Sequence, residues 1–238
     1  MDAMSSSNDV PETLPRHLGF ILDGNRRWAR QHSLPVFDGH LAGYNALKEV
    51  ARACFDAGIP YVSLYVFSTE NWKRDKSEVS NIMRLMLRAV GTDLKELIDN
   101  QVRVRFLGSR EGLSPKILNA LANAEAKTLH YTRSTIAFCF NYGGQQEIID
   151  ATRQCVKDGL IGDEITPEAI AERLYAPDIP PIDMVVRTSG EQRLSNFMLW
   201  RAAYSELYFI EKYWPDMTKQ DVTSIIKEYQ RRQRRFGS

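Results

Sequence analysis

Short apolar runs alternate with longer segments of helical periodicity along this chain. The runs are rich in β-branched and aromatic residues and are bounded by turn-forming residues, which predicts strands over 18–22, 61–67, 102–107, 136–140, 183–187 and 207–210. Between them, apolar residues recur at three- and four-residue steps, which predicts amphipathic helices over 39–57, 78–98, 115–130, 145–157 and from 218 onwards. A Thr-Pro pair at 166–167 is typical of the start of another short helix. This alternation indicates an α/β fold, a single domain with a mainly parallel central sheet flanked by helices.

The composition fits one folded domain and argues against a general nucleic-acid binder. The chain has 238 residues and a formal net charge of +1, so it lacks the basic excess that such binders carry. Residues 1–15 are polar and rich in Ser, Asp and Pro. We therefore expect a disordered N-terminal tail over 1–15, followed by a single domain over 16–238.

Cysteine usage and the N-terminal sequence bear on the compartment. Cys54, Cys139 and Cys155 lie far apart and show neither zinc-binding spacing nor a disulfide framework, which is typical of a reducing compartment. The N-terminus lacks the basic start and apolar stretch of a signal peptide, and the sequence contains no run of about 18 apolar residues. We expect a soluble, cytoplasmic protein.

Polar loops follow three of the predicted strands. They are Asp23-Gly24-Asn25, the segment 68–72, and the segment 187–191, which continues to Arg193 and Ser195. Because the carboxyl ends of parallel strands meet at one edge of a sheet, these loops should converge. Together they supply a carboxylate, arginines and hydroxyls beside apolar walls, which suits a metal ion and an apolar substrate with a phosphate or diphosphate head. For the first loop alone, a strand–turn–helix with a solvated basic first turn is an equal alternative.

The common catalytic motifs do not account for this set of residues. The sequence has no G-x-x-x-x-G-K-[ST] loop and no G-x-G-x-x-G after a strand. It also lacks G-x-S-x-G and H-E-x-x-H. The phosphate-binding hypothesis therefore needs another basis.

Several longer motifs, in order along the chain, resemble the cis-prenyltransferases, which include the undecaprenyl diphosphate synthases. They are DGNRRWAR from Asp23, the segment from Gly39-His40 to Gly43, FSTENW from Phe67, FNYGG from Phe140, and RTSGEQRLSNF followed by SELYF. The resemblance implies a homodimeric α/β enzyme with an apolar product tunnel. It implies that isopentenyl diphosphate is added to an allylic diphosphate (dimethylallyl, geranyl or farnesyl), with a cis double bond made at each step. The DDxxD motifs of the all-helical trans-acting enzymes do not occur here.

The resemblance also implies roles for the acidic and amide residues. Asp23 matches the family's essential aspartate, which handles Mg²⁺ bound to diphosphate, and Glu206 matches the second metal-associated acid. Asn71 matches the residue usually given as the proton acceptor. Because a neutral amide is a very poor base, we expect Asn71 to orient the substrate while a diphosphate oxygen or a water takes the proton.

Three groups of substrate-binding residues follow from the same resemblance. The pocket for the allylic diphosphate is expected to contain Gly24, Asn25, Arg26, Arg27, Trp28 and His40. A flexible loop is expected to contribute Phe67, Ser68, Thr69, Glu70, Trp72 and Arg74. The pocket for isopentenyl diphosphate is expected to contain Arg187, Arg193 and Ser195. Arg235 begins a segment that resembles the C-terminal Arg-x-Gly element, which reaches the diphosphates and in many members comes from the partner chain.

The chain also departs from the family pattern. Arg26 stands where the family often has Gly, and Val36 stands where bacterial members usually have an arginine, so Arg26 is a candidate replacement. Tyr44 and Val66 are bulky at positions that line the tunnel in the family and are often small, which favours a short or medium product. Met83, Met86 and Leu87 are equally compatible with ordinary helix core and with a tunnel wall.

Two other functions and a membrane contact stay open at this point. The first alternative is a non-catalytic partner subunit of the same fold, although such partners lose the strand-tip aspartate and the arginines. The second is a phosphate-binding α/β protein with unrelated chemistry. Apart from Arg235, the basic C-terminus is either a solvated helix face or a contact for anionic headgroups at a membrane surface, through Arg231, Arg232 and Arg234.

Overall fold

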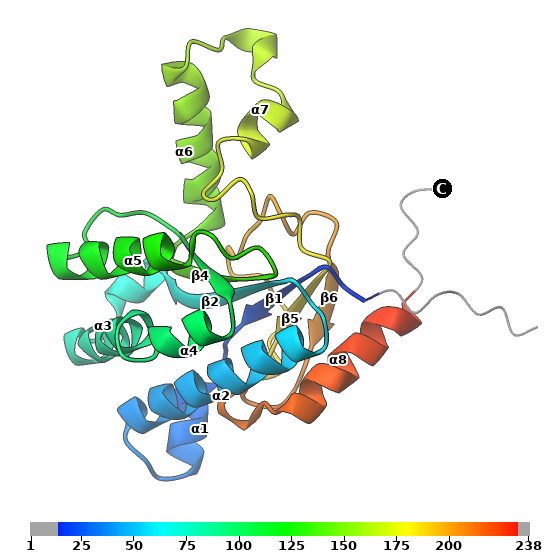
Figure 1. Ribbon diagram of the computed structural model, residues 1–238. Helices are drawn as coiled ribbons and strands as arrows, with labels where there is room; N and C mark the ends of the chain where they lie inside the picture. Colours follow the sequence, from blue (N-terminus) through cyan, green and yellow to red (C-terminus); the bar gives the residue numbers. More distant parts are fainter. Residues whose placement is uncertain (1–13, 233–238) are drawn as a thin grey trace, which may run out of the picture.

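Six parallel strands form the central sheet of the computed structural model, which describes residues 14–232 (Figure 1). The order across the sheet is β3-β4-β2-β1-β5-β6. The predicted parallel α/β fold is confirmed. Of the predicted N-terminal tail, only Leu14 and Pro15 fall within the described residues, and Pro15 is buried. The strands are β1 (His17–Ile21), β2 (Tyr61–Ser68), β3 (Val102–Leu107), β4 (Ser134–Tyr142), β5 (Met184–Arg187) and β6 (Glu206–Phe209).

Burial along the strands follows their positions in the sheet. All nine residues of β4 are buried because the strand lies between two neighbours and is covered on both faces. At the edge, β3 buries Val102 and Val104 while Arg103 and Arg105 stay partly exposed. Both arginines pair with Asp178, at 3.0 and 2.6 Å. The alternation of Val and Arg therefore marks a strand with one wet face, as predicted.

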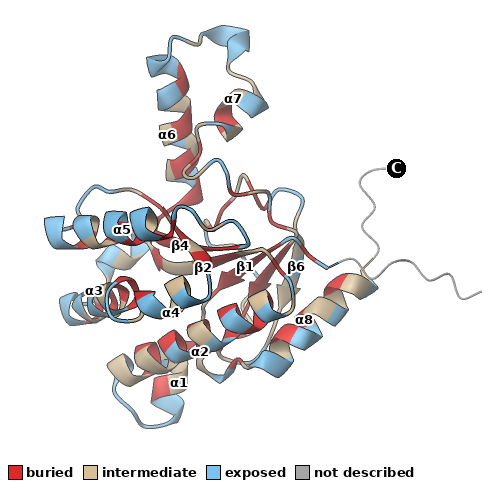
Figure 2. Cartoon of the chain, in the orientation of Figure 1, coloured by how far each residue is buried: buried red, intermediate tan, exposed pale blue. Residues whose placement is uncertain are grey.

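The helices cover the two faces of the sheet unequally. The larger buried cluster lies between the sheet and α2, α3, α4, α5 and α8 (Figures 1 and 2). On the other face, the segment 179–202 packs on the sheet, and α6 and α7 project as an arm. No helix within residues 14–232 combines the length and apolarity needed to cross a bilayer. The helices are α1 (Asn25–Gln31), α2 (Val36–Asp56), α3 (Lys76–Val90), α4 (Leu94–Asp99), α5 (Pro115–Thr128), α6 (Gly144–Lys157), α7 (Pro167–Ala171) and α8 (Lys219–Arg231), with short 3₁₀ turns at η1 (Thr69–Lys73), η2 (Gly162–Glu164) and η3 (Trp214–Asp216).

The prediction of one helix over 78–98 is wrong, because the helix is broken between α3 and α4. Gly91 ends α3 with φ −107° and ψ −93°, which is outside the helical region. Asp93 then accepts a hydrogen bond from the Tyr44 hydroxyl at 2.8 Å and one from Lys48 at 3.3 Å. Two effects therefore favour the break: glycine is a poor helix former, and the contacts of Asp93 with α2 hold the chain in its new direction.

His17 in β1 is fully buried and packs between β2 and the loop before β5. Its Nδ1 lies 2.9 Å from the Pro180 carbonyl oxygen, and its Nε2 lies 2.7 Å from the Ser63 hydroxyl. A carbonyl oxygen can only accept, so Nδ1 carries the proton and Nε2 accepts from Ser63. Burial lowers the pKa of His17 to about 4, so the imidazole is neutral in the folded protein. His17 is therefore a packing residue of the sheet.

This burial predicts that the protein loses stability at mildly acidic pH. The unfolded chain binds a proton at His17 below about pH 6.5, whereas the folded protein binds it only near pH 4. The contribution of neutral His17 to the free energy of unfolding is thus fully present above about pH 6.5. At pH 5 its protonation in the unfolded chain should lower that free energy by about 2 kcal/mol. The measurement is the free energy of unfolding in urea at pH 7.5 and 5.0, for the wild type and His17→Gln. The variant should be less stable at pH 7.5 but should lose about 2 kcal/mol less between the two pH values. Equal losses in the two proteins would contradict the prediction.

Candidate active site

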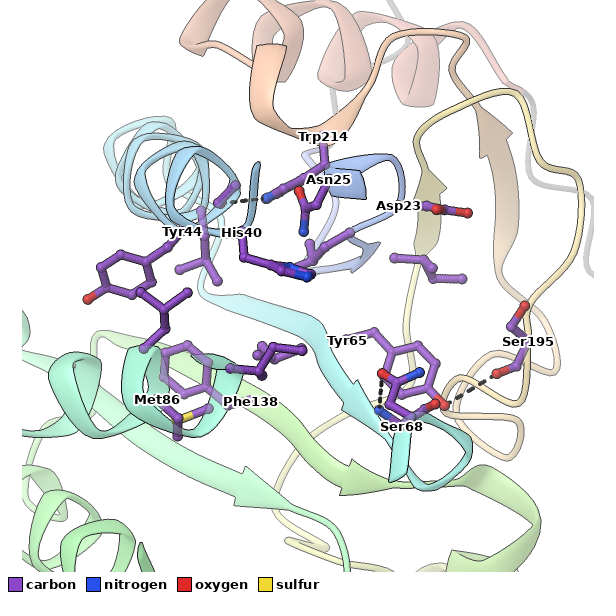
Figure 3. A pocket seen from close by; sticks show the side chains of 18 of the residues that line it. Asp23, Asn25, His40, Tyr44, Tyr65, Ser68, Met86, Phe138, Ser195 and Trp214 are labelled. Atoms are coloured by element: carbon purple, nitrogen blue, oxygen red, sulfur yellow. Dashed lines mark hydrogen bonds between the residues drawn. The ribbon is translucent and has the colours of Figure 1, made fainter. Parts of the chain in front are cut away.

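The three predicted polar loops meet at the carboxyl edge of the sheet. Ile21 and Arg187, the last residues of β1 and β5, pair with each other, and β2 on the other side of β1 continues three residues beyond Tyr65, the partner of Ile21. The three loops surround a cavity of about 660 Å³. Figure 3 shows polar residues such as Asp23 and Ser195 at one end and Tyr44, Met86 and Phe138 at the other. The predicted convergence is confirmed, and the hollow has an ionic end and an apolar end.

Asp23 is bracketed by two guanidinium groups. Its Oδ2 accepts a hydrogen bond from Arg187 Nη2 at 2.8 Å, and its Oδ1 accepts one from Arg27 Nη2 at 3.2 Å. Burial alone would raise the pKa of Asp23, but the hydrogen bonds and charges of Arg187 and Arg27 outweigh it, so the pKa is lowered. Asp23 is therefore an ionised carboxylate at neutral pH.

Two residues that the sequence analysis did not assign to the site fix the backbone of Asp23. The Thr188 hydroxyl accepts from the Asp23 amide at 3.0 Å and donates to its carbonyl oxygen at 2.6 Å. The same carbonyl accepts from the amide of Trp214 at 3.0 Å. Thr188 immediately follows the predicted strand-tip Arg187 in the RTSGE motif, and this position could have assigned it to the site. Trp214 is distant from Asp23 in the sequence, and no sequence feature indicated its contact with Asp23.

Arg187 is almost fully buried and connects the first and third loops. Besides Asp23, its Nη1 contacts the Ser195 hydroxyl at 2.7 Å and the Arg193 carbonyl oxygen at 2.5 Å. Two buried polar atoms of this site, Arg187 Nε and Asn25 Oδ1, have no hydrogen-bond partner within the described part of the chain. Buried polar atoms are rarely left unpaired in native proteins, so this end of the cavity is suited to a polar ligand.

Close contact with α2 positions α1 and its arginines. A Cβ on Gly39 would lie 2.2 Å from the carbonyl oxygen of Asn25, and one on Gly43 would lie 2.3 Å from Asn25 Oδ1. Only glycine permits this approach at the two positions. Gly24 precedes α1 with φ 111°, a left-handed conformation that side chains rarely adopt, and thereby turns the chain from Asp23 into the helix.

Glu78, at the start of α3, contacts three of the predicted substrate-binding residues. Its Oε1 lies 3.1 Å from His40 Nε2 and 2.9 Å from Arg74 Nη1, and its Oε2 lies 3.9 Å from Arg26 Nε. The Glu78 side chain is 8% exposed. Burial lowers the pKa of His40 more than Glu78 raises it, so His40 is neutral and donates from Nε2 to Glu78. The sequence analysis missed Glu78 because an acidic residue in the first turn of a helix is common.

The loop after β2 is a single 3₁₀ turn, η1, in which Asn71 has a defined contact. Asn71 Oδ1 accepts from the Ser68 amide at 3.1 Å, so the orientation of its side chain is fixed. Glu70 Oε1 lies 3.3 Å from Asn196 Nδ2, which connects this turn to the loop after β5. Trp72 donates from its indole to Asn141 at 2.7 Å and packs edge-on against Phe67.

The predicted site residues divide into three groups by position. Those that line the cavity are Asp23, Asn25, His40, Ser68, Glu70, Asn71, Arg74, Arg187, Arg193 and Ser195. Arg26 and Arg27 reach this group through ion pairs with Glu78 and Asp23. The remaining described ones lie outside the lining: Gly24, Trp28, Phe67, Thr69, Trp72 and Glu206. Arg235 lies outside the described residues. Of the helix residues left open, Met86 lines the cavity, whereas Met83 and Leu87 pack against the main core.

Glu206 is far from Asp23 within one chain. It begins β6 and pairs in register with Met184, which pairs with Leu18 of β1. Asp23 is five residues beyond Leu18, about 16 Å along the strand direction at about 3.3 Å per residue. Glu206 instead pairs with Arg232 at 2.9 Å. Across residues 14–232, no three His, Cys, Asp or Glu side chains form a group that could hold a metal ion. The structure therefore does not unite the two predicted metal acids in a single chain.

Comparisons with known proteins agree with this geometry. Residues 21–237 match the Prenyltransf family model, which is described as undecaprenyl diphosphate synthase. An isoprenyl transferase of Thermotoga maritima is 45% identical over 226 residues, covering 94% of this chain and 97% of the relative. One from Agrobacterium fabrum is 46% identical over 230 residues, covering 95% and 93%.

A solved structure gives the same picture. Lavandulyl diphosphate synthase from Lavandula x intermedia, in complex with dimethylallyl diphosphate, superposes with a TM-score of 0.90 at 30% identity, covering 94% of this chain and 99% of the other. The chain therefore belongs to the undecaprenyl diphosphate synthase family and is an enzyme that transfers prenyl groups.

Proposed function

We propose that the protein is a Mg²⁺-dependent cis-prenyl diphosphate synthase. It condenses isopentenyl diphosphate stepwise with an allylic diphosphate (farnesyl, geranyl or dimethylallyl) to give a cis-polyprenyl diphosphate. The observation that carries this proposal is the single cavity with the buried Arg187 guanidinium and the partly buried Asp23 carboxylate at one end and Tyr44, Met86 and Phe138 at the other. A prenyl diphosphate has the same division into an anionic head and an apolar chain.

The arginines suit the charge that develops during the reaction. Breaking the allylic C–O bond leaves a negatively charged diphosphate and an allylic cation. Guanidinium groups that are already held in position stabilise that growing charge without reorganisation. Arg187 Nε, which is buried and unpartnered among residues 14–232, is a suitable donor to a diphosphate oxygen. A planar guanidinium can pair with two oxygens at once, which favours arginine over lysine here.

The chemistry of Asp23 fits a magnesium ion that arrives with the substrate. Mg²⁺ is usually bound by one or two carboxylates together with phosphate oxygens and water, so a preformed cage of acids is not needed. Asp23 is ionised and lines the cavity, and it is our candidate protein ligand. When bound, the ion would neutralise charge on the diphosphate.

We propose that Asn71 orients the substrate and that a diphosphate oxygen or a water accepts the proton. Its Oδ1 is engaged by the Ser68 amide, which leaves the amide N–H groups as donors.

We also propose that Arg26 replaces the arginine that bacterial members have at Val36. Arg26 approaches the buried Glu78 that holds His40 and Arg74, and this supports the replacement.

The wall around Tyr44 supports a limit on product length. A second cavity of about 120 Å³ lies beyond the first, and the two share Tyr44, Leu47, Ala89 and Phe138 as lining. The Tyr44 ring is held by its hydrogen bond to Asp93 and lies 5.7 Å from the Arg88 guanidinium carbon. We propose that the apolar part of the first cavity begins the product tunnel and that Tyr44 ends it, giving a short or medium product.

We propose a homodimer in which a second chain completes the site. β6 is an edge strand, Leu207 on it is 38% exposed, and nearby Tyr204 is 85% exposed. Glu206 lies at the far end of the sheet from its own Asp23, so a metal-associated role for it requires the partner chain.

A cytoplasmic location and membrane contact remain predictions. At the end of α8, Arg231 pairs with Glu228, and Arg232 pairs with Glu228 and Glu206, which reduces the availability of both arginines to headgroups.

The defining assay combines purified protein, Mg²⁺ and labelled isopentenyl diphosphate with dimethylallyl, geranyl or farnesyl diphosphate in turn. We expect a Mg²⁺-dependent ladder of products on chromatography, whose end point gives the chain length. Absence of incorporation with every primer would contradict the proposal and favour a non-catalytic partner subunit.

We predict that Asp23→Ala folds normally but loses at least about 100-fold in turnover, equivalent to about 2.7 kcal/mol of transition-state stabilisation. The reason is the loss of the only acidic side chain that contacts both Arg27 and Arg187 among the described residues. Turnover is measured by labelled incorporation and folding by thermal denaturation. Asp99→Ala, which removes a surface carboxylate paired with Lys95, is the control and should keep wild-type activity. Turnover of Asp23→Ala within about three-fold of wild type would refute the assigned role.

We predict that Tyr44→Ala lengthens the product, because removal of the ring would join the two cavities. Tyr44→Phe removes only the hydroxyl that contacts Asp93 and should keep the wild-type length if the bulk of the ring is what stops growth. Products of the three proteins are compared by chromatography under identical conditions. An unchanged length in Tyr44→Ala would exclude this residue as the end of the tunnel.

A further inference from the structure

Five charged side chains at the ionic end of the cavity alternate in sign. Arg187 contacts Asp23 at 2.8 Å, Asp23 contacts Arg27 at 3.2 Å, and Arg27 Nη1 contacts Glu191 Oε1 at 3.1 Å. Glu191 Oε2 then pairs with Arg193 Nη1. Arg187 Nη1 donates to the carbonyl oxygen of Arg193 at 2.5 Å and closes the set into a ring. Glu191 is thus the one member of the ring that the proposed reaction has not used.

The backbone of the loop after β5 directs Glu191 towards these arginines. Ser189 and Gly190 have φ values of 74° and 75°, so two successive residues adopt left-handed conformations. Their amides are fixed to the carbonyl oxygens of Lys212 and Ile210, each at 2.9 Å. The side chain of Glu191 is therefore presented to the site by a constrained turn.

The two ion pairs of Glu191 are accessible to water. The side chains of Glu191, Arg27 and Arg193 are 31%, 38% and 58% exposed. The hydrogen bond and charge of Arg193 lower the pKa of Glu191, so it is ionised at neutral pH. Ion pairs at such exposure contribute little to stability and are screened by salt. Glu191 can be displaced from these guanidiniums at small cost, unlike a partner of the buried Arg187.

A diphosphate would use the same donors. Guanidinium groups bind phosphate oxygens in pairs, and a diphosphate carries several such oxygens and more than one negative charge. By resemblance, Arg27 belongs to the pocket for the allylic diphosphate and Arg193 to the pocket for isopentenyl diphosphate. Glu191 contacts one arginine of each pocket.

We propose that Glu191 competes with diphosphate groups for Arg27 and Arg193, weakens their binding and speeds their release. The inference rests on the proposed function, since it takes these arginines as diphosphate ligands. Each condensation leaves inorganic diphosphate, and binding that is equally tight before and after the transition state does not raise turnover. A carboxylate that reoccupies the arginines favours departure of that product.

The test is Glu191→Gln in the full-length protein, titrated with inorganic diphosphate in magnesium-free buffer by calorimetry. Because the variant loses the competing charge but keeps the side-chain size, we expect a Kd about ten-fold lower than that of the wild type, equivalent to about 1.4 kcal/mol. In steady state, KM for isopentenyl diphosphate and kcat should both fall. A merely structural loss would instead raise KM.

The matched control is Glu211→Gln. Glu211 is exposed, and its Oε2 would lie 2.6 Å from a Cβ on Gly190, so it is close to the same turn and carries the same charge. Its replacement should change the Kd of inorganic diphosphate less than two-fold, since its carboxylate does not occupy Arg27 or Arg193.

Equal or weaker diphosphate binding by Glu191→Gln would overturn the inference, since Glu191 would then organise the arginines. A shift of the same size in Glu211→Gln would also overturn it, because the effect would come from net charge. Binding of inorganic diphosphate does not require prenyl transfer. If Glu191→Gln binds diphosphate more tightly but the protein forms no product, competition is supported and the proposed function is contradicted. If the protein forms product but Glu191→Gln binds diphosphate as the wild type does, the proposed function is supported and competition is contradicted.

Discussion

The ion pair between Arg187 and Asp23 is the interaction on which the candidate site depends. It joins neighbouring strands β5 and β1 at the point where each ends. Burying a guanidinium is costly unless its donors are satisfied, and Arg187 offsets this cost through Asp23, Ser195 and the Arg193 carbonyl. Asp23 is the one charged partner of Arg187 among the described residues, and without Asp23 the Ser195 hydroxyl and the Arg193 carbonyl still contact the guanidinium. The loops after β1 and β5 are therefore held together by the same group that is proposed to bind substrate.

Two carboxylates that the sequence analysis left unassigned arrange the surrounding cations differently. Glu78 is buried and holds His40, Arg74 and, at longer range, Arg26. Glu191 is partly exposed and holds Arg27 and Arg193. Breaking the ion pairs of a buried carboxylate is costly, whereas a solvated carboxylate is readily displaced from its cations by a stronger anionic ligand. The protein thus combines fixed and exchangeable electrostatic partners around one hollow.

The strands and the polar edge were predictable because their signals are local. A β-branched run ended by Asp23-Gly24 carries strand, turn and charge within a few residues, and a parallel arrangement then brings such ends together. The break at Gly91 was not predictable from periodicity, since Leu94 and Leu97 continue the apolar spacing of α3. It depends on Tyr44 and Lys48, which are distant in sequence. The position of Glu206 likewise follows only from strand register, which an apolar pattern of four residues does not fix.

The contact of Asn25 with Gly39 and Gly43 has a mechanical consequence. With no space for even a methyl group between α1 and α2, the two helices behave as one rigid body. α1 carries Arg26 and Arg27 at the anionic end, and α2 carries Tyr44 beside the apolar end. A growing prenyl chain that pushed α2 aside would therefore shift the arginines of α1 with it. Strain at the apolar end of the product would in this way weaken the contacts of these arginines with its diphosphate.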